Sequence, residues 1–272
     1  LKQKASQIGI TPSSLVLAAF AEILTFWSRK PSFTINLTLF NRLPLHSEVN
    51  QIIGDFTSST LLAVDNSEQN SFTLRAKKIQ AQLWEDLDHR YVSGVKVLRE
   101  LARLQGRTTG ALMPVVFTST LTQNIQHQPS LPTEVVYSLS QTSQVYLDHQ
   151  VSEIENALVF NWDTIDELFP AGVLDDMFAV YSDFLHRLAN DAEIWDASTR
   201  LLLPPSQIEQ ITATNRTEQE IAQKNSLLHD LFFEQVSLNP QNTAIITSHC
   251  RITYQELGDR SLNLAHQLKT LG

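Results

Sequence analysis

Two short strand-like stretches in the middle of the chain constrain its fold most, because polar groups capable of chemistry lie at the end of each. Residues 113–117 are continuously apolar and include two valines, which predicts a strand buried on both faces that ends at Thr118. In residues 144–148, apolar and polar side chains alternate, so Gln144 and Asp148 share one face of a second strand. A hydroxyl and a carboxylate can therefore meet in one cleft.

A purely structural interpretation of these two residues is the simpler alternative. A threonine at a strand end is usually a turn residue, and an aspartate there usually caps a turn or a helix. Periodicity alone leaves both a structural and a catalytic role open for Thr118 and Asp148.

The size and charge of the chain argue against several classes of protein. With 272 residues it is long enough for one or two domains, and its 42% apolar and 18% charged residues are typical of a soluble globular protein. The formal net charge of −9, without a basic cluster, argues against nucleic acid or an anionic membrane as a partner. No stretch reaches the roughly 18 apolar residues of a membrane span, and the N-terminus does not resemble a signal peptide.

Cysteine and histidine usage predicts neither a disulfide framework nor a metal centre. Cys250 is the only cysteine, which fits a reducing cytoplasm, and without a basic neighbour we interpret it as a partly buried structural thiol. His89 lies between Asp86 and Asp88, but three polar residues at a helix end more often form a solvated face than a metal site. The first residue is Leu1 rather than Met, so we expect the chain to begin inside a longer protein.

Periodicity predicts a helix followed by two strands in the first quarter of the chain. Thr11 can cap a helix that begins with a proline, and apolar residues then recur at helical spacing. Residues 33–39 alternate, and their polar face, which includes Asn36, suits either a substrate channel or a solvated surface, of which we favour the surface. Gly54 is free to take a positive φ before a strand at residues 60–64.

Apolar spacing predicts four further elements. Residues 72–90 and 94–105 read as helices, and residues 157–162 as a return strand. The helix that follows carries an apolar stripe with Met177 and Tyr181, which we interpret as core residues rather than cofactor contacts. In residues 72–90 the predicted apolar stripe consists of Leu74, Ile79, Leu83 and Leu87. In residues 94–105 it consists of Val95, Leu98 and Leu101.

A change of composition near Thr199 predicts a domain boundary. Residues 1–198 are expected to form one domain, and residues 199–226, rich in polar side chains, an ordered-to-flexible linker. In residues 227–272 we expect a helix, a strand, a turn and the start of another helix, which together begin a second domain.

Several groups of residues form an ordered set of motifs. They are Thr11-Pro12 with Ile23-Leu24 and Trp27; Gly54-Asp55-Phe56-Thr57 with Leu61-Leu62; Pro114 to Leu121; and Gln144-Val145 through Asp148-His149 to Trp162-Asp163, Phe169-Pro170, Gly172, Met177 and Tyr181. This set resembles the later motifs of heterocyclization domains of nonribosomal peptide synthetases, which are relatives of the condensation domains. The run Ile252-Thr253-Tyr254-Gln255-Glu256-Leu257 resembles the first core motif of an adenylation domain.

The resemblance implies a fold and a reaction. The fold is α/β: the C-terminal lobe of a condensation domain, which is chloramphenicol acetyltransferase-like, with a mixed sheet flanked by helices, followed by a linker and an N-terminal fragment of an adenylation domain. The reaction joins a carrier-bound acyl or peptidyl thioester to carrier-bound Cys, Ser or Thr, and then removes water to close a thiazoline or oxazoline ring. Upstream and downstream carrier domains bring the substrates on phosphopantetheine arms, and the chain needs no cofactor or metal of its own.

The same resemblance implies roles for individual residues. Dehydration requires a group that gives a proton to a departing hydroxyl and another that fixes its orientation. By position in the motifs, Asp148 is implied as the proton-transfer group and Thr118 as a hydrogen-bonding partner of the leaving oxygen or of Asp148. Gln144 is implied to hold the amide, and Asn36 to help position the substrate.

One motif separates the cyclizing from the amide-forming subfamily. Amide-forming condensation domains generally have Asn where this chain has Thr57 or Ser58, so the Asp55-Phe56-Thr57 form favours cyclization. Asp55 and Thr57 are therefore included as substrate-positioning candidates. By its sequence alone, Asp55 would be interpreted as a turn aspartate.

The chain departs from the family pattern in two ways. Ser143 replaces a proline, which loosens the approach to the strand without removing a chemical group. The family's N-terminal lobe is not present and the active-site tunnel lies between the two lobes, so we expect the chain alone to be inactive, or to work beside a chain that supplies that lobe. Two alternatives are an ordinary amide-forming condensation domain and a non-catalytic docking lobe.

Overall fold

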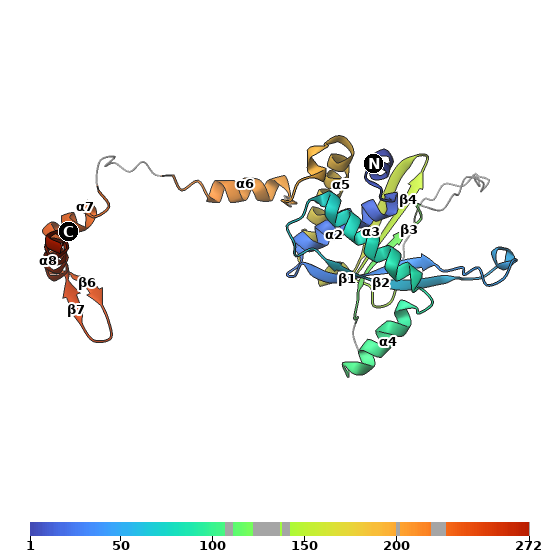
Figure 1. Ribbon diagram of the computed structural model, residues 1–272, viewed down its shortest axis with the longest axis horizontal. Helices are drawn as coiled ribbons and strands as arrows, with labels where there is room; N and C mark the ends of the chain where they lie inside the picture. Colours follow the sequence, from blue (N-terminus) through green and yellow to red (C-terminus); the bar gives the residue numbers. More distant parts are fainter. Residues whose placement is uncertain (107–110, 122–136, 138–141, 200–201, 219–226, 272) are drawn as a thin grey trace. The chain divides into compact units, whose positions relative to one another are not determined.

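A computed structural model describes residues 1–106, 111–121, 137, 142–199, 202–218 and 227–271 (Figure 1). The chain divides into two compact units, Leu1–Ile211 and Thr212–Gly272. The predicted linker contains residues 200–201 and 219–226, which lie outside the described residues.

A five-stranded mixed sheet with the strand order β2-β1-β3-β4-β5 forms the centre of the first unit. The two inner pairings, β1 with β3 and β3 with β4, are parallel, and the two outer pairings are antiparallel. This arrangement confirms the expected α/β fold with a mixed sheet. The strands are β1 (Ser32–Phe40), β2 (Thr57–Asp65), β3 (Val115–Ser119), β4 (Leu147–Ile154) and β5 (Ala157–Thr164).

The helices of the first unit begin and end largely as predicted. Helix α2 starts at Pro12, and the hydroxyl of Thr11 accepts a hydrogen bond from the Ser14 amide at 3.1 Å, as expected for an N-cap. The helices are α1 (Lys2–Ile8), α2 (Pro12–Trp27), α3 (Phe72–Asp88), α4 (Gly94–Leu104), α5 (Val173–Asn190) and α6 (Pro205–Thr214), with short 3₁₀ turns η1 (Val49–Gln51), η2 (Asp166–Leu168) and η3 (Glu193–Trp195).

Helices α2, α3 and α5 pack together with one face of the sheet and form the core (Figure 1). Phe20 of α2 is the centre of this packing, with ring centroids 4.8 Å from His149 on β4 and 6.1 Å from Phe117 on β3. Met177 and Tyr181 of α5 are 5% and 0% exposed, which confirms that they are core residues. We call this side of the sheet the covered face.

The buried stripe of α3 differs from the predicted one. Leu74 is 55% exposed, whereas Arg75 is only 4% exposed. Arg75 occupies an inward position because it forms an ion pair with Glu22 of α2. In α4 the predicted stripe is also wrong at Val95, which is 47% exposed.

The second predicted strand near the centre of the chain was placed too early. Strand β4 begins at Leu147 and continues to Ile154, so Asp148 lies near its start rather than at its end. Gln144 has a left-handed φ of 67° in the turn before the strand. Gly54 was free to take a positive φ, but it does not adopt one.

A tight hairpin fixes the register between β4 and β5. Glu155 and Asn156 at its turn have φ values of 49° and 63°, the left-handed pair that a two-residue hairpin turn requires. The register places Asp148 opposite Asp163 and His149 opposite Trp162. Because side chains alternate along a strand, Asp148 and Asp163 lie on the face of the sheet opposite to the covered face.

The second unit contains the elements that were expected in it, together with a second strand. They are α7 (Asp230–Leu238), β6 (Thr243–Ile246), β7 (Arg251–Thr253) and α8 (Tyr254–Leu271). The two helices approach closely, since a Cβ on Gly258 would lie 3.1 Å from the Val236 side chain. Cys250 was predicted to be partly buried but is exposed, because it lies in the turn between the two strands.

The domain boundaries drawn from composition stay a prediction, although the stretch predicted to be a linker holds a helix. Helix α6 lies within residues 199–226, and the two compact units divide between Ile211 and Thr212.

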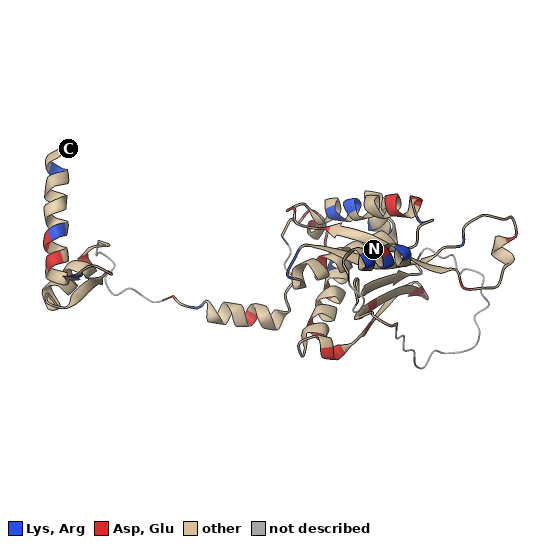
Figure 2. Ribbon diagram, turned by 90° about the horizontal axis from the view of Figure 1, so that it is seen from below, with Lys and Arg blue, Asp and Glu red and all other residues tan. Residues whose placement is uncertain are grey.

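Within the described residues, no single helix has the length and apolarity of a membrane span. Helices α1 and α2 pass such a test only as a pair bent by 93°, and α2 supplies much of the buried core. Basic and acidic residues are interspersed along the helices of the first unit (Figure 2).

Candidate functional site

A cavity of about 800 Å³ lies on the face of the sheet opposite to the covered face. We call this side the open face. Strands β1, β3 and β4 contribute polar residues to the cavity, and helix α4 and residues 112–113 contribute mostly apolar ones. Its lining includes Asn36, Thr38, Thr57, Ser58, Ser59, Val95, Leu98, Arg99, Ala102, Leu112, Met113, Val116, Thr118, Thr142, Ser143, Gln144, Val145, Asp148 and Gln150.

Asp148 is the buried carboxyl group of this cavity. It is 8% exposed, and its Oδ2 accepts a hydrogen bond from Gln150 Nε2 at 3.0 Å. Its Oδ1 is buried without a hydrogen-bond partner. Burial raises the pKa of Asp148, the Gln150 hydrogen bond opposes that rise, and the nearby charge of Asp163 adds to it. The carboxyl group is thus suited to carry and release a proton.

Thr118 also lines the cavity, but its hydroxyl is directed to another strand. Its Oγ1 donates to Thr38 Oγ1 of β1 at 2.9 Å. Along the sheet Thr118 pairs with Gln150, whereas Asp148 pairs with Val116, so the two candidates are one step apart on the same face. The structure therefore brings them to one cavity, with Thr38 rather than Asp148 as the hydrogen-bond partner of Thr118.

Asn36 lies on the same face as Thr118 and Asp148. It pairs with Val116 in the register between β1 and β3, and its Oδ1 is buried without a partner. Sequence periodicity favoured a solvated surface for this face, but Asn36 lines the cavity. Together with the free Asp148 oxygen, its amide oxygen gives the cavity a second unsatisfied polar atom that a substrate can engage.

Three other sequence candidates have different positions. Gln144 is exposed and lines the cavity from the turn before β4, not from the strand itself. Thr57 lines the cavity as well, at the start of β2. Asp55 is exposed and is not part of the lining; its Oδ1 accepts a hydrogen bond from the Thr57 amide at 2.8 Å, and hydrogen bonds from Thr57 lower its pKa. Asp55 is placed as a turn aspartate that orders Thr57.

Sequence reasoning missed Thr38 and Gln150. Thr38 follows Asn36 by two residues on a strand that was predicted, and Gln150 follows Asp148 by two residues. The signal for both was the two-residue period of the strands. Gln150 was overlooked because β4 was expected to end at Asp148.

Helix α4 lies close to the sheet because its first residue has no side chain. A Cβ on Gly94 would lie 2.8 Å from Ser59 Oγ and 3.1 Å from the Ser59 carbonyl oxygen. Val95, Leu98 and Ala102 of this helix then line the cavity. The cavity therefore combines a polar floor with a partly apolar wall.

His149, the next residue after Asp148, belongs to the covered face. It is fully buried, and its Nε2 lies 2.8 Å from the Tyr181 hydroxyl. Burial lowers the pKa of His149 to about 3, so the imidazole is neutral at physiological pH. It contacts the aromatic core rather than the cavity and is excluded from direct proton transfer there.

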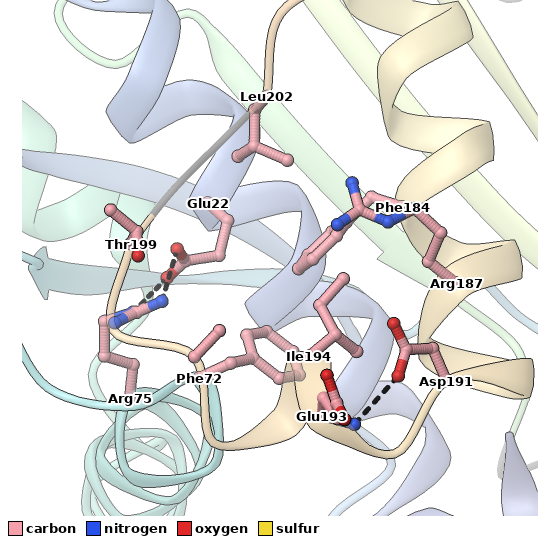
Figure 3. A pocket seen from close by; sticks show the side chains of 11 residues that line it. Glu22, Phe72, Arg75, Phe184, Arg187, Asp191, Glu193, Ile194, Thr199 and Leu202 are labelled. Atoms are coloured by element: carbon pink, nitrogen blue, oxygen red, sulfur yellow. Dashed lines mark hydrogen bonds and ion pairs between the residues drawn. The ribbon is translucent and has the colours of Figure 1, made fainter.

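A second, smaller cavity of about 260 Å³ lies next to an ion pair that the sequence did not reveal (Figure 3). Arg75 donates to both carboxylate oxygens of Glu22, at 2.6 Å from Nε and 2.9 Å from Nη2. A third hydrogen bond joins Arg75 to the Asn70 carbonyl oxygen. Glu22 is therefore held as a buried anion.

Metal-binding groups do not cluster in the part of the chain that is described. No set of three His, Cys, Asp or Glu residues there has the geometry to hold an ion. His89 is exposed at the end of α3, with Nδ1 2.9 Å from the Glu85 carbonyl oxygen.

Comparisons with known proteins give consistent similarities. A condensation-domain family model matches residues 1–212. Phenyloxazoline synthase MbtB of Mycolicibacterium paratuberculosis is 37% identical over 99% of this chain, and the chain covers 23% of that protein. The chain spans between 5% and 23% of the length of three curated relatives that it matches, this one included.

Solved structures show the same similarity. The EpoB cyclization-docking bidomain from Sorangium cellulosum is 46% identical, with a TM-score of 0.62 over 72% of this chain and 39% of that one. The nonribosomal peptide synthetase FmoA3 is 32% identical, with a TM-score of 0.73 over 100% of this chain and 31% of that one.

Proposed function

The chain belongs to the condensation-domain family of nonribosomal peptide synthetases, a family of acyltransferase-type enzymes, and we propose that its open-face cavity is part of a heterocyclization site. The products would be thiazoline or oxazoline rings made from carrier-bound Cys, Ser or Thr. Similarity to a phenyloxazoline synthase and to a cyclization-docking bidomain supports this choice over simple amide formation.

The observation that carries the proposal is the state of Asp148. Its carboxyl group is 8% exposed, has one oxygen without a partner, and lies in a cavity large enough for a substrate. Burial raises the pKa of Asp148, which favours the protonated form that a general acid needs. A residue with a purely structural role would be expected to use both of its carboxylate oxygens.

The proposed reaction has two chemical stages that balance without a cofactor. In the first, the acceptor amine displaces the donor thiol and forms an amide. In the second, the acceptor side chain adds to the amide carbonyl carbon, and the carbonyl oxygen becomes a hydroxyl. Asp148 then gives its proton to that hydroxyl, which leaves as water, and the ring nitrogen loses its proton as the C=N bond forms. That proton restores the Asp148 carboxyl group.

Neighbouring polar groups fit supporting roles in this scheme. Asn36 offers a carbonyl oxygen to the substrate N–H, and Thr118 offers its hydroxyl to the departing oxygen once Thr38 releases it. Gln144 at the cavity mouth is suited to hold the amide, and Asp55 orders Thr57 beside it.

We also propose that residues 227–272 begin an adenylation domain and that carrier domains deliver both substrates on phosphopantetheine arms. The similarity to FmoA3 extends over 100% of the chain, which supports a synthetase segment beyond the first unit. The proposal includes no metal or dissociable cofactor of the chain's own.

Intact mass spectrometry of the carrier-bound product tests the function. The synthetase polypeptide that contains this chain would be assayed with loaded carrier domains, as wild type, as Asp148→Asn and as Asp183→Asn. We expect wild type and the control Asp183→Asn, an exposed residue of α5 outside the cavity, to give a product lighter by one water, and Asp148→Asn to accumulate the uncyclised amide. Cyclisation should fall by a factor of about 10² to 10⁴, as for loss of a general acid.

Two outcomes would contradict the proposal. An uncyclised amide from the wild type would identify an ordinary condensation domain. A cyclised product from Asp148→Asn at the wild-type rate would remove Asp148 from the chemistry and leave the lobe a docking role.

A further inference from the structure

A second carboxyl group lies directly across the strand pair from Asp148. The antiparallel register between β4 and β5 pairs Asp148 with Asp163, and directly opposed residues project from the same face of a sheet. The hairpin turn at Glu155 and Asn156 holds this register. Two acidic side chains are therefore held side by side on the open face of the sheet, where like charges repel, and Asp148 is the one of the two that lines the cavity.

The amide of Gln150 connects these two carboxyl groups. Its Nε2 donates to Asp148 Oδ2 at 3.0 Å and lies 3.4 Å from Asp163 Oδ2. One NH₂ group has two hydrogens, so it can serve both acceptors at once. Gln150 lines the cavity beside Asp148.

From this geometry we propose that Asp163, joined through Gln150, is a positioning residue that keeps Asp148 in its proton-donating form. The inference rests on the proposed cyclodehydration, which it deepens by assigning the control of the acid. In this scheme Asp163 takes no part in the proton transfer itself: the Asp148 proton goes to the departing hydroxyl and is replaced by the proton of the ring nitrogen.

Few other charged groups face Asp148. From β1 and β3 the neighbours on this face, Asn36 and Thr118, are uncharged. Arg99 of α4 is the other charged residue among the described residues that line the cavity. His149 projects to the covered face, and Asp148 forms no ion pair with a described basic residue.

The electrostatic balance at Asp148 is consistent with this arrangement. Burial is the largest influence and raises its pKa; the hydrogen bond from Gln150 lowers the pKa, and the charge of Asp163 raises it. Asp163 and Gln150 thus shift the pKa of Asp148 in opposite directions. Substitutions at the two residues should therefore have opposite effects if their role is electrostatic, which support of the fold alone does not predict.

The test is the pH profile of cyclisation, measured as the ratio of cyclised to uncyclised carrier-bound product in the full synthetase. An acid catalyst loses activity as pH rises through its pKa. Asp163→Asn removes the like charge and should move the alkaline limb to lower pH, which reduces cyclisation at pH 8 by roughly three- to tenfold. Gln150→Leu removes the opposing hydrogen bond and should move the limb to higher pH. Asp163→Glu keeps the charge and should restore the wild-type limb.

The outcomes separate this inference from the function on which it rests. Unchanged limbs in Asp163→Asn and Gln150→Leu, with cyclisation lost in Asp148→Asn, would overturn the inference and leave the function intact. Wild-type cyclisation in Asp148→Asn would overturn the function itself. Should Asp163→Asn fail to fold, the direction of the shift in Gln150→Leu decides, because a merely structural role predicts no shift of the limb.

Discussion

Two buried carboxyl groups among the described residues of the first unit, Glu22 and Asp148, are held in contrasting ways. Glu22 lies among the core helices at 1% exposure and receives two hydrogen bonds from the Arg75 guanidinium. Asp148 lies on the open face at 8% exposure and receives one hydrogen bond from the uncharged Gln150 amide. Figure 3 shows the first arrangement, with Arg75 and Glu22 facing one another beside the smaller cavity.

The contrast shows which kind of burial is compatible with proton transfer. A carboxylate paired with a guanidinium is fixed as an anion, because Arg cannot be deprotonated in a protein. A buried carboxyl group with an amide partner and a spare oxygen can exchange its proton at little structural cost. Burial alone therefore does not mark an active site; the identity of the partner does.

The largest effect is expected where the fixed pair is broken. Arg75→Met leaves the Glu22 charge buried beside an apolar side chain, which should lower the free energy of unfolding by about 4 kcal/mol. Tryptophan fluorescence during denaturation measures this, since Trp27, Trp84, Trp162 and Trp195 all lie in the first unit.

Two companion variants make this measurement specific. Lys78→Met removes an exposed partner of Glu68, 3.8 Å away, and should change stability by less than about 0.5 kcal/mol. The double variant Glu22→Leu/Arg75→Met should recover most of the loss. A loss in the double variant as large as in Arg75→Met would show that packing, rather than the unpaired charge, is responsible.

The next effect concerns His149, the covered-face neighbour of Asp148. Its pKa is lowered from 6.5 to about 3 in the folded state, so the unfolded state binds more protons between these values. Stability should therefore fall on acidification, with His149 contributing roughly 3 kcal/mol of that loss between pH 7 and pH 4. In His149→Gln the decline between these pH values should be shallower by that amount.

His186→Gln, at an exposed position of α5, provides the matched control for replacing a histidine by glutamine without disturbing the core. Equal slopes for wild type and His149→Gln would contradict the assignment of His149 as a buried neutral imidazole.

A smaller effect is expected at the wall of the open-face cavity. Gly94→Ala places a Cβ against Ser59, so helix α4 must shift away from β2, at a cost of about 1 to 2 kcal/mol. Gly106→Ala is the control that separates crowding from backbone strain. At Gly106 no atom lies within 4 Å of the added Cβ, but φ is 64°. If the cyclisation rate falls in Gly94→Ala but not in Gly106→Ala, α4 takes part in substrate binding. If Gly94→Ala is as stable as wild type, the close packing of α4 against β2 is contradicted.

The smallest effect is expected from Asp148→Asn on stability. Because the pKa of Asp148 is raised on folding, its ionisation at neutral pH disfavours the folded state, and this penalty is absent below the unfolded-state pKa. The asparagine variant should therefore be as stable as wild type at pH 3 and slightly more stable at pH 7, by less than about 1 kcal/mol. Chemical denaturation at the two pH values measures the difference, and a clear loss of stability at pH 7 would make Asp148 a structural residue like Glu22.

Local signals made most of the fold predictable. The Thr11 cap and its following proline located α2, alternation located β1, the turn at Gly54 located β2, and apolar spacing located β5. The start of β4 was not predictable from alternation, because residues 144–146 continue the pattern of the strand while Gln144 takes a left-handed φ. A turn of that kind depends on tertiary context rather than on the residue type.

Only some members of the candidate site were predictable, and none of their connections was. Asp148, Thr118 and Asn36 were found in one cavity, as expected from strand ends and from the family motifs. The partnership of Thr118 with Thr38, and that of Asp148 with Gln150 and Asp163, depends on which strands are neighbours. A single sequence does not specify strand order, so these connections required the structure. The Glu22–Arg75 pair was missed because it depends on how helices α2 and α3 pack against each other, which a single sequence does not specify either.

The alternation of Asp148 and His149 at the start of β4 has a consequence for how this segment can evolve. The two residues are adjacent but project to opposite faces, one into the cavity and one into the aromatic core. Insertion or deletion of a single residue before them would exchange the faces of the sheet to which their side chains project. A carboxyl group would then enter the aromatic core, and an imidazole would take its place in the cavity. A point substitution changes one side chain of this strand at a time, whereas a single-residue insertion or deletion disrupts the core and the cavity together.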